Sequence, residues 1–459
     1  MMDFSKISHI WFIGIGGIGM SALARYFTAG DFTVGGYDRT ESPLTKNLAS
    51  EGMELVFTDD PCMVPLHYLD KEKSLIIYTP AIPDDNSILN YFRSEGYKMH
   101  KRSEILGVIS RNTRSVAVAG THGKTSVSTL TAHLLKQSET DCSAFLGGIS
   151  KNYNTNLLTG TGNITVMEAD EFDRSFLQLY PEMALITSLD ADHLDVYGDH
   201  DSMVRAYQEF TGNVKDGGTI IINEKIAGRL RIPEKLKSYT YGFMDSSDYY
   251  PSDITVSEGA YHFHIHGPEG VIRDISLLLP GRMNIENAVG AVALAQLAGA
   301  SDDDIRKALL YYKGVARRFD LRIDSDSIIY IDDYAHHPEE LKYCVESVRE
   351  FYGDRRITGI FQPHLYTRTR DHASAFAKAL DKLDRAVLLP VYPAREEAIE
   401  GVDSGIIYER MNLKDKQLAM KEEVPDLLEG MDIEVLITMG AGDIDRLVGP
   451  IEALLKRRI

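Results

Sequence analysis

The segment Gly120–Ser126, which reads GTHGKTS, combines residue types that could hold a phosphate group. The apolar run SVAVA precedes it and a helical pattern follows, so its glycines stand at a strand-to-helix turn. Glycines let the backbone curl until its N–H groups face an anion, and a helix N-terminus adds positive partial charge. Lys124 can reach the β- and γ-phosphates of a nucleotide, and the Thr125 hydroxyl can bind Mg²⁺. Val118 stands where the general pattern has its first glycine, so a glycine turn with a solvated lysine is the alternative.

Acidic residues follow two further apolar runs and could hold a metal ion. Glu168 ends the run NITVME and opens the acidic segment Glu168–Asp173, and a second acidic segment, Asp190–Asp195, contains His193. Carboxylates at the carboxyl ends of neighbouring parallel strands meet at one rim of a sheet. Oxygen ligands suit Mg²⁺, so Glu168 and His193 are the preferred ligands beside Thr125. The other acids are also explained as helix caps or solvated loop residues.

A second glycine-rich loop lies near the N-terminus. It contains Gly14, Gly16, Gly17 and Gly19 between an apolar run and a helical pattern, and Asp38 ends the next apolar run. This arrangement is typical of dinucleotide binding, so an NAD-dependent oxidoreductase is a fair hypothesis. The same loop could hold the pyrophosphate of any nucleotide-sugar, or it could be a tight turn without a ligand.

Three α/β segments would position these residues. Apolar runs alternate with helical patterns throughout the chain, which predicts parallel sheets with crossover helices. Residues from about Asp248 to Leu279 instead alternate polar and apolar, which predicts a small antiparallel sheet attached to the second segment. We therefore expect a Rossmann-like domain over 1–113, a central P-loop ATPase-like domain over 114–320, and a Rossmann-like C-terminal domain over 321–459.

Composition narrows the class of protein. The 459 residues carry a net charge of -19, with 44% hydrophobic and 25% charged residues, as expected for globular domains and unlike a nucleic-acid binder. The three cysteines lie far apart, without zinc or disulfide spacing. The first apolar run is short, is rich in glycine and has no cleavage site after it, and no run approaches about 18 apolar residues. We expect a cytoplasmic protein that binds neither nucleic acid nor membranes.

Ordered sequence blocks resemble the Mur ligases over essentially the whole chain. GIGGIGMSALA, GTHGKTS, EADEFDRSF and DADHLDVY are similar to the family's first glycine loop, ATP loop and metal segments. GRMNIENAVGA, GVARRFD, DDYAHHPEEL, FQPHLYTRTRD and MGAGDI are similar to its later blocks, in the same order. The resemblance implies three domains: the first holds a UDP-sugar, the second holds ATP, and the third closes over both.

The resemblance also assigns roles residue by residue. The implied UDP-sugar residues are Gly14, Gly16, Gly17, Gly19 and Asp38. The implied ATP-binding residues are Gly120, Thr121, His122, Gly123, Lys124, Thr125, Ser126, Asn287, Arg318 and Asp333. The implied metal ligands are Thr125, Glu168 and His193. At the acyl centre the resemblance implies His336, His364, Tyr366 and Arg370, and as catalytic residues Lys124, His193, His337 and Arg368.

The implied reaction joins L-alanine to the lactyl carboxylate of UDP-N-acetylmuramate through an acyl phosphate. It implies ATP and Mg²⁺ as cofactors, with two ions and Mn²⁺ as a substitute, in a monomer or weak homodimer. Sister ligases carry a carbamylated lysine after the metal histidine, but the first lysine here is Lys215, which fits the alanine-adding branch. Leu365 and Met283 replace an arginine and a histidine that are usual in the family.

Other hypotheses stay open at this point. A related ligase attaches a recycled murein tripeptide to the same sugar nucleotide, and its layout is similar. An oxidoreductase would leave GTHGKTS and the third segment unexplained. A silent nucleotide-binding regulator is disfavoured because Lys124, Thr125, Glu168 and His193 occur together. His337 is a candidate to orient or deprotonate alanine, although a residue before Pro338 could instead begin a helix.

Overall fold

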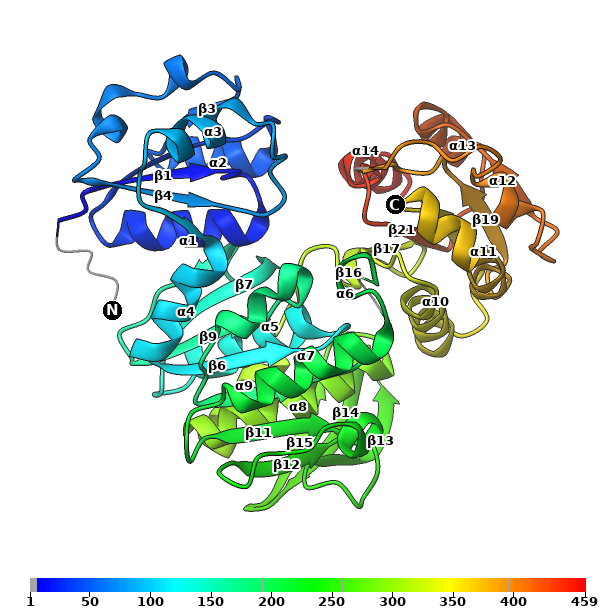
Figure 1. Cartoon of the computed structure of the whole chain (residues 1–459). Helices are drawn as coiled ribbons and strands as arrows, with labels where there is room; N and C mark the ends of the chain where they lie inside the picture. The colour runs from blue at the N-terminus through cyan, green and yellow to red at the C-terminus, as the bar shows by residue number, and fades with distance from the viewer. Residues whose placement is uncertain (1–5, 192–193, 258, 395) are drawn as a thin grey trace. The chain divides into compact units, whose positions relative to one another are not determined.

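The computed structural model (Figure 1) describes residues 6–191, 194–257, 259–394 and 396–459. Their backbone contacts divide the chain into two compact units. The first comprises the residues up to 254 together with 263–276 and 286–312, and the second comprises 255–262, 277–285 and 313–459. Each unit is described by itself below.

The first sheet of the first unit is five-stranded and parallel. Its strand order is β3-β2-β1-β4-β5. The strands are β1 (His9–Ile13), β2 (Thr33–Tyr37), β3 (Glu54–Val56), β4 (Ser74–Tyr78) and β5 (Met99–Lys101), and the helices are α1 (Ile18–Ala29), α2 (Pro43–Ser50), α3 (Ser87–Ser94) and α4 (Arg102–Asn112). Ile10 to Ile13 are fully buried, because helices and loops cover both faces of the central strand. The glycine loop therefore begins at the carboxyl edge of a buried sheet.

The second sheet of this unit has seven strands in the order β12-β11-β10-β6-β9-β7-β8. The strands are β6 (Arg114–Ala119), β7 (Ser143–Ser150), β8 (Thr155–Leu158), β9 (Ile164–Glu168), β10 (Met183–Ile186), β11 (Thr219–Asn223) and β12 (Lys237–Tyr241). All pairs are parallel except β7 with β8. Because β6 lies between β9 and β10, the loop after β6 is flanked by the residues that directly follow β9 and β10.

Helices and a small sheet complete the middle of the chain. The helices are α5 (Lys124–Lys136), α6 (Leu194–Tyr197), α7 (His200–Gly212), α8 (Arg282–Ala298) and α9 (Asp302–Leu310). The strands β13 (Tyr250–Ser257), β14 (Ala260–Gly267) and β15 (Gly270–Leu277) form a three-stranded sheet in sequence order. Connections this short join antiparallel neighbours. In β14 the buried side chains alternate with three partly exposed histidines, as the polar and apolar alternation predicts.

The two sheets of the first unit are tied together by α1. This helix packs against β7 and β8, and one hydrophobic cluster contains residues from both sheets. Asn156 on β8 donates from Nδ2 to Ser21 Oγ at 2.9 Å and accepts from Arg25 Nη1 at 2.5 Å. The helix that follows the first glycine loop is thus fixed to the second sheet.

The second unit contains a six-stranded sheet in the order β16-β17-β21-β18-β19-β20. The strands are β16 (Asp320–Asp324), β17 (Ile329–Asp333), β18 (Ile357–Phe361), β19 (Arg385–Leu388), β20 (Lys416–Leu418) and β21 (Val435–Met439), and the helices are α10 (Pro338–Tyr352), α11 (Tyr366–Leu380), α12 (Gly405–Tyr408), α13 (Val424–Glu429) and α14 (Asp445–Lys456). Only β16 runs antiparallel to its neighbour. Two hydrophobic clusters cover the two faces of this six-stranded sheet, and α10 packs against α11.

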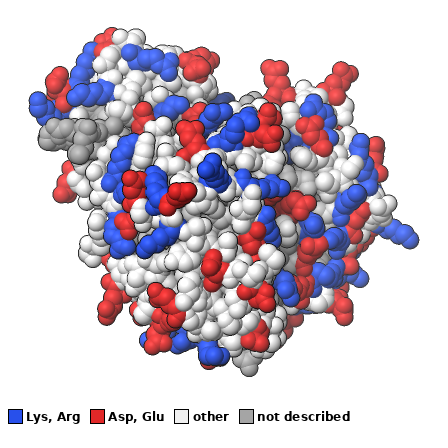
Figure 2. Space-filling view, turned by 60° about the horizontal axis from the view of Figure 1, so that its bottom comes forward, with Lys and Arg blue, Asp and Glu red and all other residues white. Residues whose placement is uncertain are grey.

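The predicted fold class is confirmed: three α/β regions carry mostly parallel sheets, with a small antiparallel sheet added. The sequence pattern predicts a helix over His372–Leu383, whereas α11 begins six residues earlier, at Tyr366. No helix among the described residues is long and apolar enough to span a membrane. On the face in Figure 2, cationic and anionic side chains are interspersed.

Candidate active site

The backbone of the phosphate-type loop requires its two glycines. The loop connects β6 to α5, and Gly120 and Gly123 have φ values of 126° and 81°. L side chains rarely adopt such angles. A Cβ atom on Gly120 would also lie 2.0 Å from Thr187 Oγ1. The turn that precedes Lys124 therefore depends on glycine for both its conformation and its space.

Residues after β10 hold this loop in place. The Ser188 hydroxyl accepts from the His122 N–H at 2.9 Å and lies 2.9 Å from Thr121 Oγ1. Thr121 Oγ1 in turn accepts from the Asp190 N–H at 3.0 Å, and Thr187 Oγ1 donates to the His122 carbonyl oxygen. These bonds shape the loop before any ligand contributes, which reduces the ordering cost of binding.

Hydrogen-bond acceptors surround the Lys124 ammonium group. Its Nζ donates to the Gly120 carbonyl oxygen at 2.6 Å and lies 2.9 and 2.8 Å from the two carboxylate oxygens of Glu171. Only 13% of the Lys124 side chain and 1% of the Glu171 side chain are exposed. Burial acts to lower the pKa of Lys124, but the carboxylates of Glu171, Glu168 and Asp170 outweigh it and raise the pKa. Lys124 therefore remains a cation throughout the physiological pH range.

Thr125 and Glu168 meet beside this lysine. The Thr125 hydroxyl donates to Glu168 Oε2 at 2.8 Å. A Cβ atom on Gly147 of β7 would lie 2.0 Å from the same carboxylate oxygen, so glycine at this position makes room for Glu168. A hydroxyl and a carboxylate are hard oxygen donors, and this donor set fits Mg²⁺.

The third predicted metal ligand, His193, lies outside the described residues. Within the part of the chain that is described, no group of three or more His, Cys, Asp or Glu side chains is arranged to hold a metal ion. The metal-ligand assignment for Thr125, Glu168 and His193 therefore stays a prediction.

The structure brings Asn287 to the loop. Asn287 belongs to α8 and is buried, and a Cβ atom on Gly123 would lie 3.0 Å from its Oδ1 atom. Ser126 follows Thr125 in the first turn of α5. The predicted ATP-binding residues of the first unit thus form one cluster, whose other members are Gly120, Thr121, His122, Gly123, Lys124 and Thr125.

The first glycine loop is supported by Asp38. Its Oδ2 accepts from the Gly16 N–H at 2.8 Å, and its Oδ1 accepts from the Thr40 N–H at 3.1 Å. Gly14 has a φ of 87°, and Gly17 directly precedes α1. Asp38, which the resemblance implies as a UDP-sugar residue, therefore already accepts from two backbone N–H groups and shapes the loop.

In the second unit, Asp333 at the end of β17 is buried. Its carboxylate accepts from the N–H groups of Phe319 and Ala335 at 2.6 and 2.7 Å. Burial raises the pKa of Asp333 to about 6, against the opposing effects of Arg318 and these two bonds. The Arg318 guanidinium lies 4.9 Å from the centre of the Tyr334 ring. Asp333 thus fixes the end of β17 beside Arg318, and its ATP-binding role stays a prediction.

His336, His364 and Arg368 form a second cluster. The rings of His336 and His364 are 5.8 Å apart, and Arg368 Nη1 is 3.4 Å from His364 Nδ1. Burial is the largest effect on His336 and lowers its pKa, although Glu340 acts to raise it. A neutral imidazole beside an arginine can accept a proton or orient a polar substrate.

The structure also describes the surroundings of three other predicted residues, which are His337, Arg370 and Tyr366. His337 precedes α10, its N–H donates to Glu340 Oε2 at 3.2 Å, and its ring lies 5.2 Å from that of His372. Arg370 is half exposed, and its Nε donates to Asp371 at 2.7 Å.

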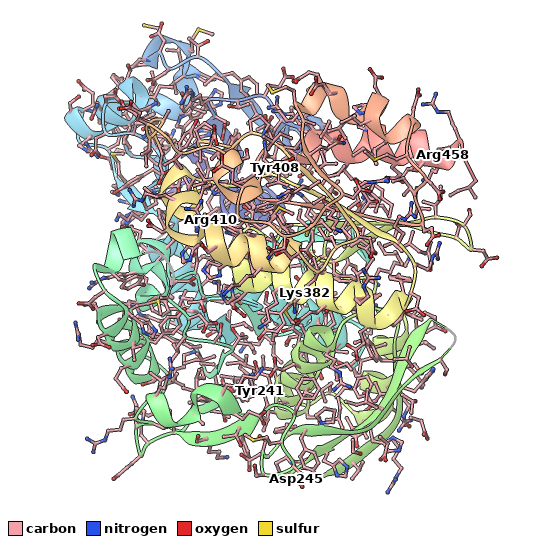
Figure 3. All side chains as sticks on the ribbon, turned by 90° about the vertical axis from the view of Figure 1, so that its right-hand side faces the viewer. Tyr241, Asp245, Lys382, Tyr408, Arg410 and Arg458 are labelled. Carbon is pink, nitrogen blue, oxygen red and sulfur yellow. The ribbon has the colours of Figure 1, made fainter. Side chains whose placement is uncertain are left out.

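Tyr366 lines a hollow of about 470 Å³ at the carboxyl ends of β19 and β20. This hollow reaches the start of α12, whose last residue, Tyr408, is labelled in Figure 3.

Sequence reasoning missed three residues that shape the site. Glu171 pairs with Lys124, Gly147 leaves space for Glu168, and Ser188 holds the loop. Glu171 stands in the acidic segment noted above, so its position carried a signal. Gly147 and Ser188 carried none, because their roles depend on which strands are neighbours.

Known proteins match this chain along its length. Three family models match: the Mur ligase family catalytic domain over residues 9–114, the Mur ligase middle domain over 118–295, and the Mur ligase glutamate ligase domain over 317–444. The chain is 46% identical over 459 residues to a UDP-N-acetylmuramate–L-alanine ligase of Parabacteroides distasonis, covering 100% of this chain and 99% of that one. It is 48% identical over 453 residues to the ligase of the same name from Porphyromonas gingivalis, covering 98% and 99%.

Solved structures match as well. The UDP-N-acetylmuramate–alanine ligase of Thermotoga maritima superposes with a TM-score of 0.81 at 26% identity, covering 97% of this chain and 99% of that one. A murein peptide ligase of Psychrobacter arcticus superposes with a TM-score of 0.69 at 20% identity, covering 98% of both, and shares the fold.

Proposed function

Because the chain belongs to the Mur ligase family, we propose that it uses ATP to join L-alanine to the lactyl carboxylate of UDP-N-acetylmuramate. The relatives that match over the full length at 46% and 48% identity are named for this activity. The products are the amide, ADP and phosphate, and the step belongs to the synthesis of peptidoglycan precursors. The observation that carries the proposal is the arrangement of Lys124 and Thr125, at the start of α5, beside Glu168 at the end of β9.

The chemistry explains why ATP is needed. A carboxylate resists attack by an amine because its charge repels the nucleophile and oxide is a very poor leaving group. In the first step a carboxylate oxygen bonds to the γ-phosphorus while the bond to ADP breaks. In the second step the neutral amine of alanine attacks the acyl carbon, phosphate leaves with the former carboxylate oxygen, and the amine loses a proton.

Phosphoryl transfer requires mainly that the protein position the reacting groups and neutralise their charge. Lys124 supplies positive charge at the β- and γ-oxygens. Thr125 and Glu168, with His193, would hold a divalent metal that neutralises further charge, and we propose Mg²⁺, as two ions, with Mn²⁺ as a substitute. Asn287, Arg318 and Asp333 complete the proposed nucleotide site.

The second unit is proposed to serve the acyl centre. His336, His364, Tyr366 and Arg370 would contact the substrates there, with His337 and Arg368 in catalytic roles. Exclusion of water by this unit would protect the acyl phosphate from hydrolysis. Gly14, Gly16, Gly17, Gly19 and Asp38 form the proposed UDP-sugar loop.

The remaining assignments follow from this function. We propose domain boundaries near residues 113 and 320, a cytoplasmic location where ATP and nucleotide-sugars are made, and a monomer or weak homodimer. An oxidoreductase is not favoured, because it would leave the loop Gly120–Ser126 without a role.

A phosphate-release assay tests the substrate. With UDP-N-acetylmuramate and ATP, we expect L-alanine to give a higher rate than glycine, L-serine or the murein tripeptide. Turnover with the tripeptide alone would contradict the proposed amino-acid substrate.

A lysine variant tests the loop. Lys124→Ala should lower the rate of phosphate release about 100-fold or more, because the loop loses its cation. Lys136→Ala, which removes an ion-paired lysine from the other end of the same helix, is the matched control and should keep its turnover. Circular dichroism should show that both variants are folded. Full activity of Lys124→Ala would refute the phosphate role of the loop.

A further inference from the structure

Arg102 lies at the first glycine loop. It is the first residue of α4 and directly follows β5, so it lies at the same carboxyl edge of the first sheet as the loop after β1. Its guanidinium occupies the space where Gly19 has no side chain: a Cβ atom on Gly19 would lie 1.8 Å from Nη1 and 2.8 Å from Cζ. The last glycine of the loop therefore makes room for a cation at the start of α1.

A carboxylate holds the other side of this guanidinium. Arg102 Nη2 donates to Asp170 Oδ2 at 3.3 Å, and 22% of the Arg102 side chain is exposed. The neighbouring Lys101 donates to Asp173 at 2.7 Å. A guanidinium has five N–H donors, and among the described residues the single acceptor of the Arg102 side chain is Asp170. Arg102 is thus oriented and retains donors for a ligand.

The charges around the loop favour an anion beside Arg102. The N-terminus of α1 contributes positive partial charge. The Asp38 carboxylate, which follows β2, already accepts from the N–H groups of Gly16 and Thr40. Arginine binds phosphate oxygens with two parallel N–H bonds, which a lysine cannot do.

We propose that Arg102 binds the pyrophosphate of the nucleotide-sugar, that Gly19 is glycine to admit its guanidinium, and that Asp170 is the positioning residue for it. The proposal rests on the proposed function, since it takes the nucleotide-sugar as the substrate. It adds a cation to the proposed UDP-sugar residues, which are otherwise four glycines and Asp38.

Two ligands distinguish between the two anions that Arg102 could bind, which are a pyrophosphate and a carboxylate. UDP-N-acetylmuramate carries both a pyrophosphate and a lactyl carboxylate, whereas UDP-N-acetylglucosamine carries the same pyrophosphate without that carboxylate. Dissociation constants are measured by calorimetry for the full-length protein, directly or by competition. Arg102→Ala should weaken both ligands by a similar factor, about tenfold or more. Arg102→Lys should give an intermediate loss, and the affinity for ATP should not change.

Gly19→Ala provides an independent test that leaves the charge in place. Its added Cβ atom would displace the guanidinium, and Gly19 lies inside α1 without a positive φ, so alanine suits the backbone. This variant should weaken both ligands as Arg102→Ala does. The double variant should be little worse than either single variant, because both remove the same contact.

Controls make the result decisive. Lys101→Ala removes the adjacent cation and should change the dissociation constants by no more than about twofold, since surface ion pairs contribute little. Thermal unfolding should show that each variant is folded. Asp170→Asn should weaken the binding of both ligands less than Arg102→Ala does. In a protein that already carries Arg102→Ala, Asp170→Asn should have no further effect on binding, whereas a merely structural role of Asp170 would still lower the affinity.

Three outcomes would overturn the proposal. A loss confined to UDP-N-acetylmuramate would assign Arg102 to the carboxylate instead. Unchanged binding in both Arg102→Ala and Gly19→Ala would remove Arg102 from the site. If the unmodified protein bound neither nucleotide-sugar, the proposed function would be overturned as well. This result is distinguishable from a failure of the Arg102 proposal because it is seen in the unmodified protein, before any substitution is made.

Discussion

Lys124 and Glu171 form a buried ion pair in the proposed nucleotide site, with the lysine ammonium 2.8 Å from the nearer carboxylate oxygen. Removing one charge of a buried pair leaves the other without compensation, which is strongly destabilising. The pair therefore couples the position of the loop lysine to the acidic segment that carries Glu168.

Glu171→Gln tests this coupling. Glutamine keeps an oxygen acceptor but not the charge, so we expect the free energy of unfolding to fall by about 1–3 kcal/mol. Phosphate release should fall about tenfold, because the Lys124 ammonium loses part of its orientation. Glu339→Gln, which removes an exposed partner of Lys342, should change neither quantity appreciably. Equal behaviour of the two variants in urea denaturation and in the assay would contradict the account.

Asp333 gives a prediction about pH. Burial raises its pKa to about 6 in the folded protein, whereas an unfolded aspartate has a pKa of about 3.9. Between these values the folded state binds a proton that the unfolded state lacks, so this group stabilises the fold at low pH and loses its effect as pH rises through 6.

The measurement is urea denaturation followed by circular dichroism at pH 7.5 and pH 5. The free energy of unfolding of the unmodified protein, relative to that of Asp333→Asn, should increase by about 1 kcal/mol when the pH is lowered over this range. A relative change of the opposite sign would mean that Asp333 is ionised and stabilising in the folded state.

At the scale of elements, the strand β7 gives Glu168 its space. A side chain at Gly147 would lie 2.0 Å from Glu168 Oε2, so Gly147→Ala should displace the carboxylate from Thr125. We expect phosphate release to fall about 10-fold to 100-fold, with a higher requirement for Mg²⁺. Gly212→Ala is the matched control, because a Cβ atom there meets nothing within 4 Å. Activity of Gly147→Ala equal to that of the control, over a Mg²⁺ titration, would argue against Glu168 as a ligand.

Apolar runs made several elements predictable. His9–Ile13 and Thr33–Tyr37 are strands in the structure, as expected, because buried parallel strands need apolar side chains on both faces. The strand Met99–Lys101 lies at a sheet edge and is too short and polar to give such a pattern. The helix at Tyr366 begins early because Leu365, with a φ of 72°, ends the preceding segment, and Leu365 has no sequence signature for that conformation.

The candidate site also contains some residues that the sequence reveals and others that it does not. Lys124 and Thr125 follow from a local motif, since strand, turn and helix occur in consecutive residues. The partners of the motif come from β7, β9 and β10, which are brought together by strand order. A single sequence does not reveal that order, so Gly147 and Ser188 could not have been found from it.

At the scale of the whole molecule, the chain is expected to divide the reaction among its parts. The first unit carries the phosphate loop and the first glycine loop, and the second unit carries the cluster of His336, His364 and Arg368. Each unit alone lacks groups that amide formation is proposed to need. Transfer of a phosphoryl group to a sugar-borne carboxylate is the step that both units are proposed to serve.

An oxygen-18 label tests that claim most directly. UDP-N-acetylmuramate labelled with oxygen-18 in its lactyl carboxylate is turned over with ATP and L-alanine, and the released phosphate is analysed by phosphorus NMR. An acyl phosphate passes one carboxylate oxygen to phosphate, so each phosphate from doubly labelled substrate should carry one labelled oxygen. Amide formation with wholly unlabelled phosphate would contradict transfer of the γ-phosphoryl group to the carboxylate.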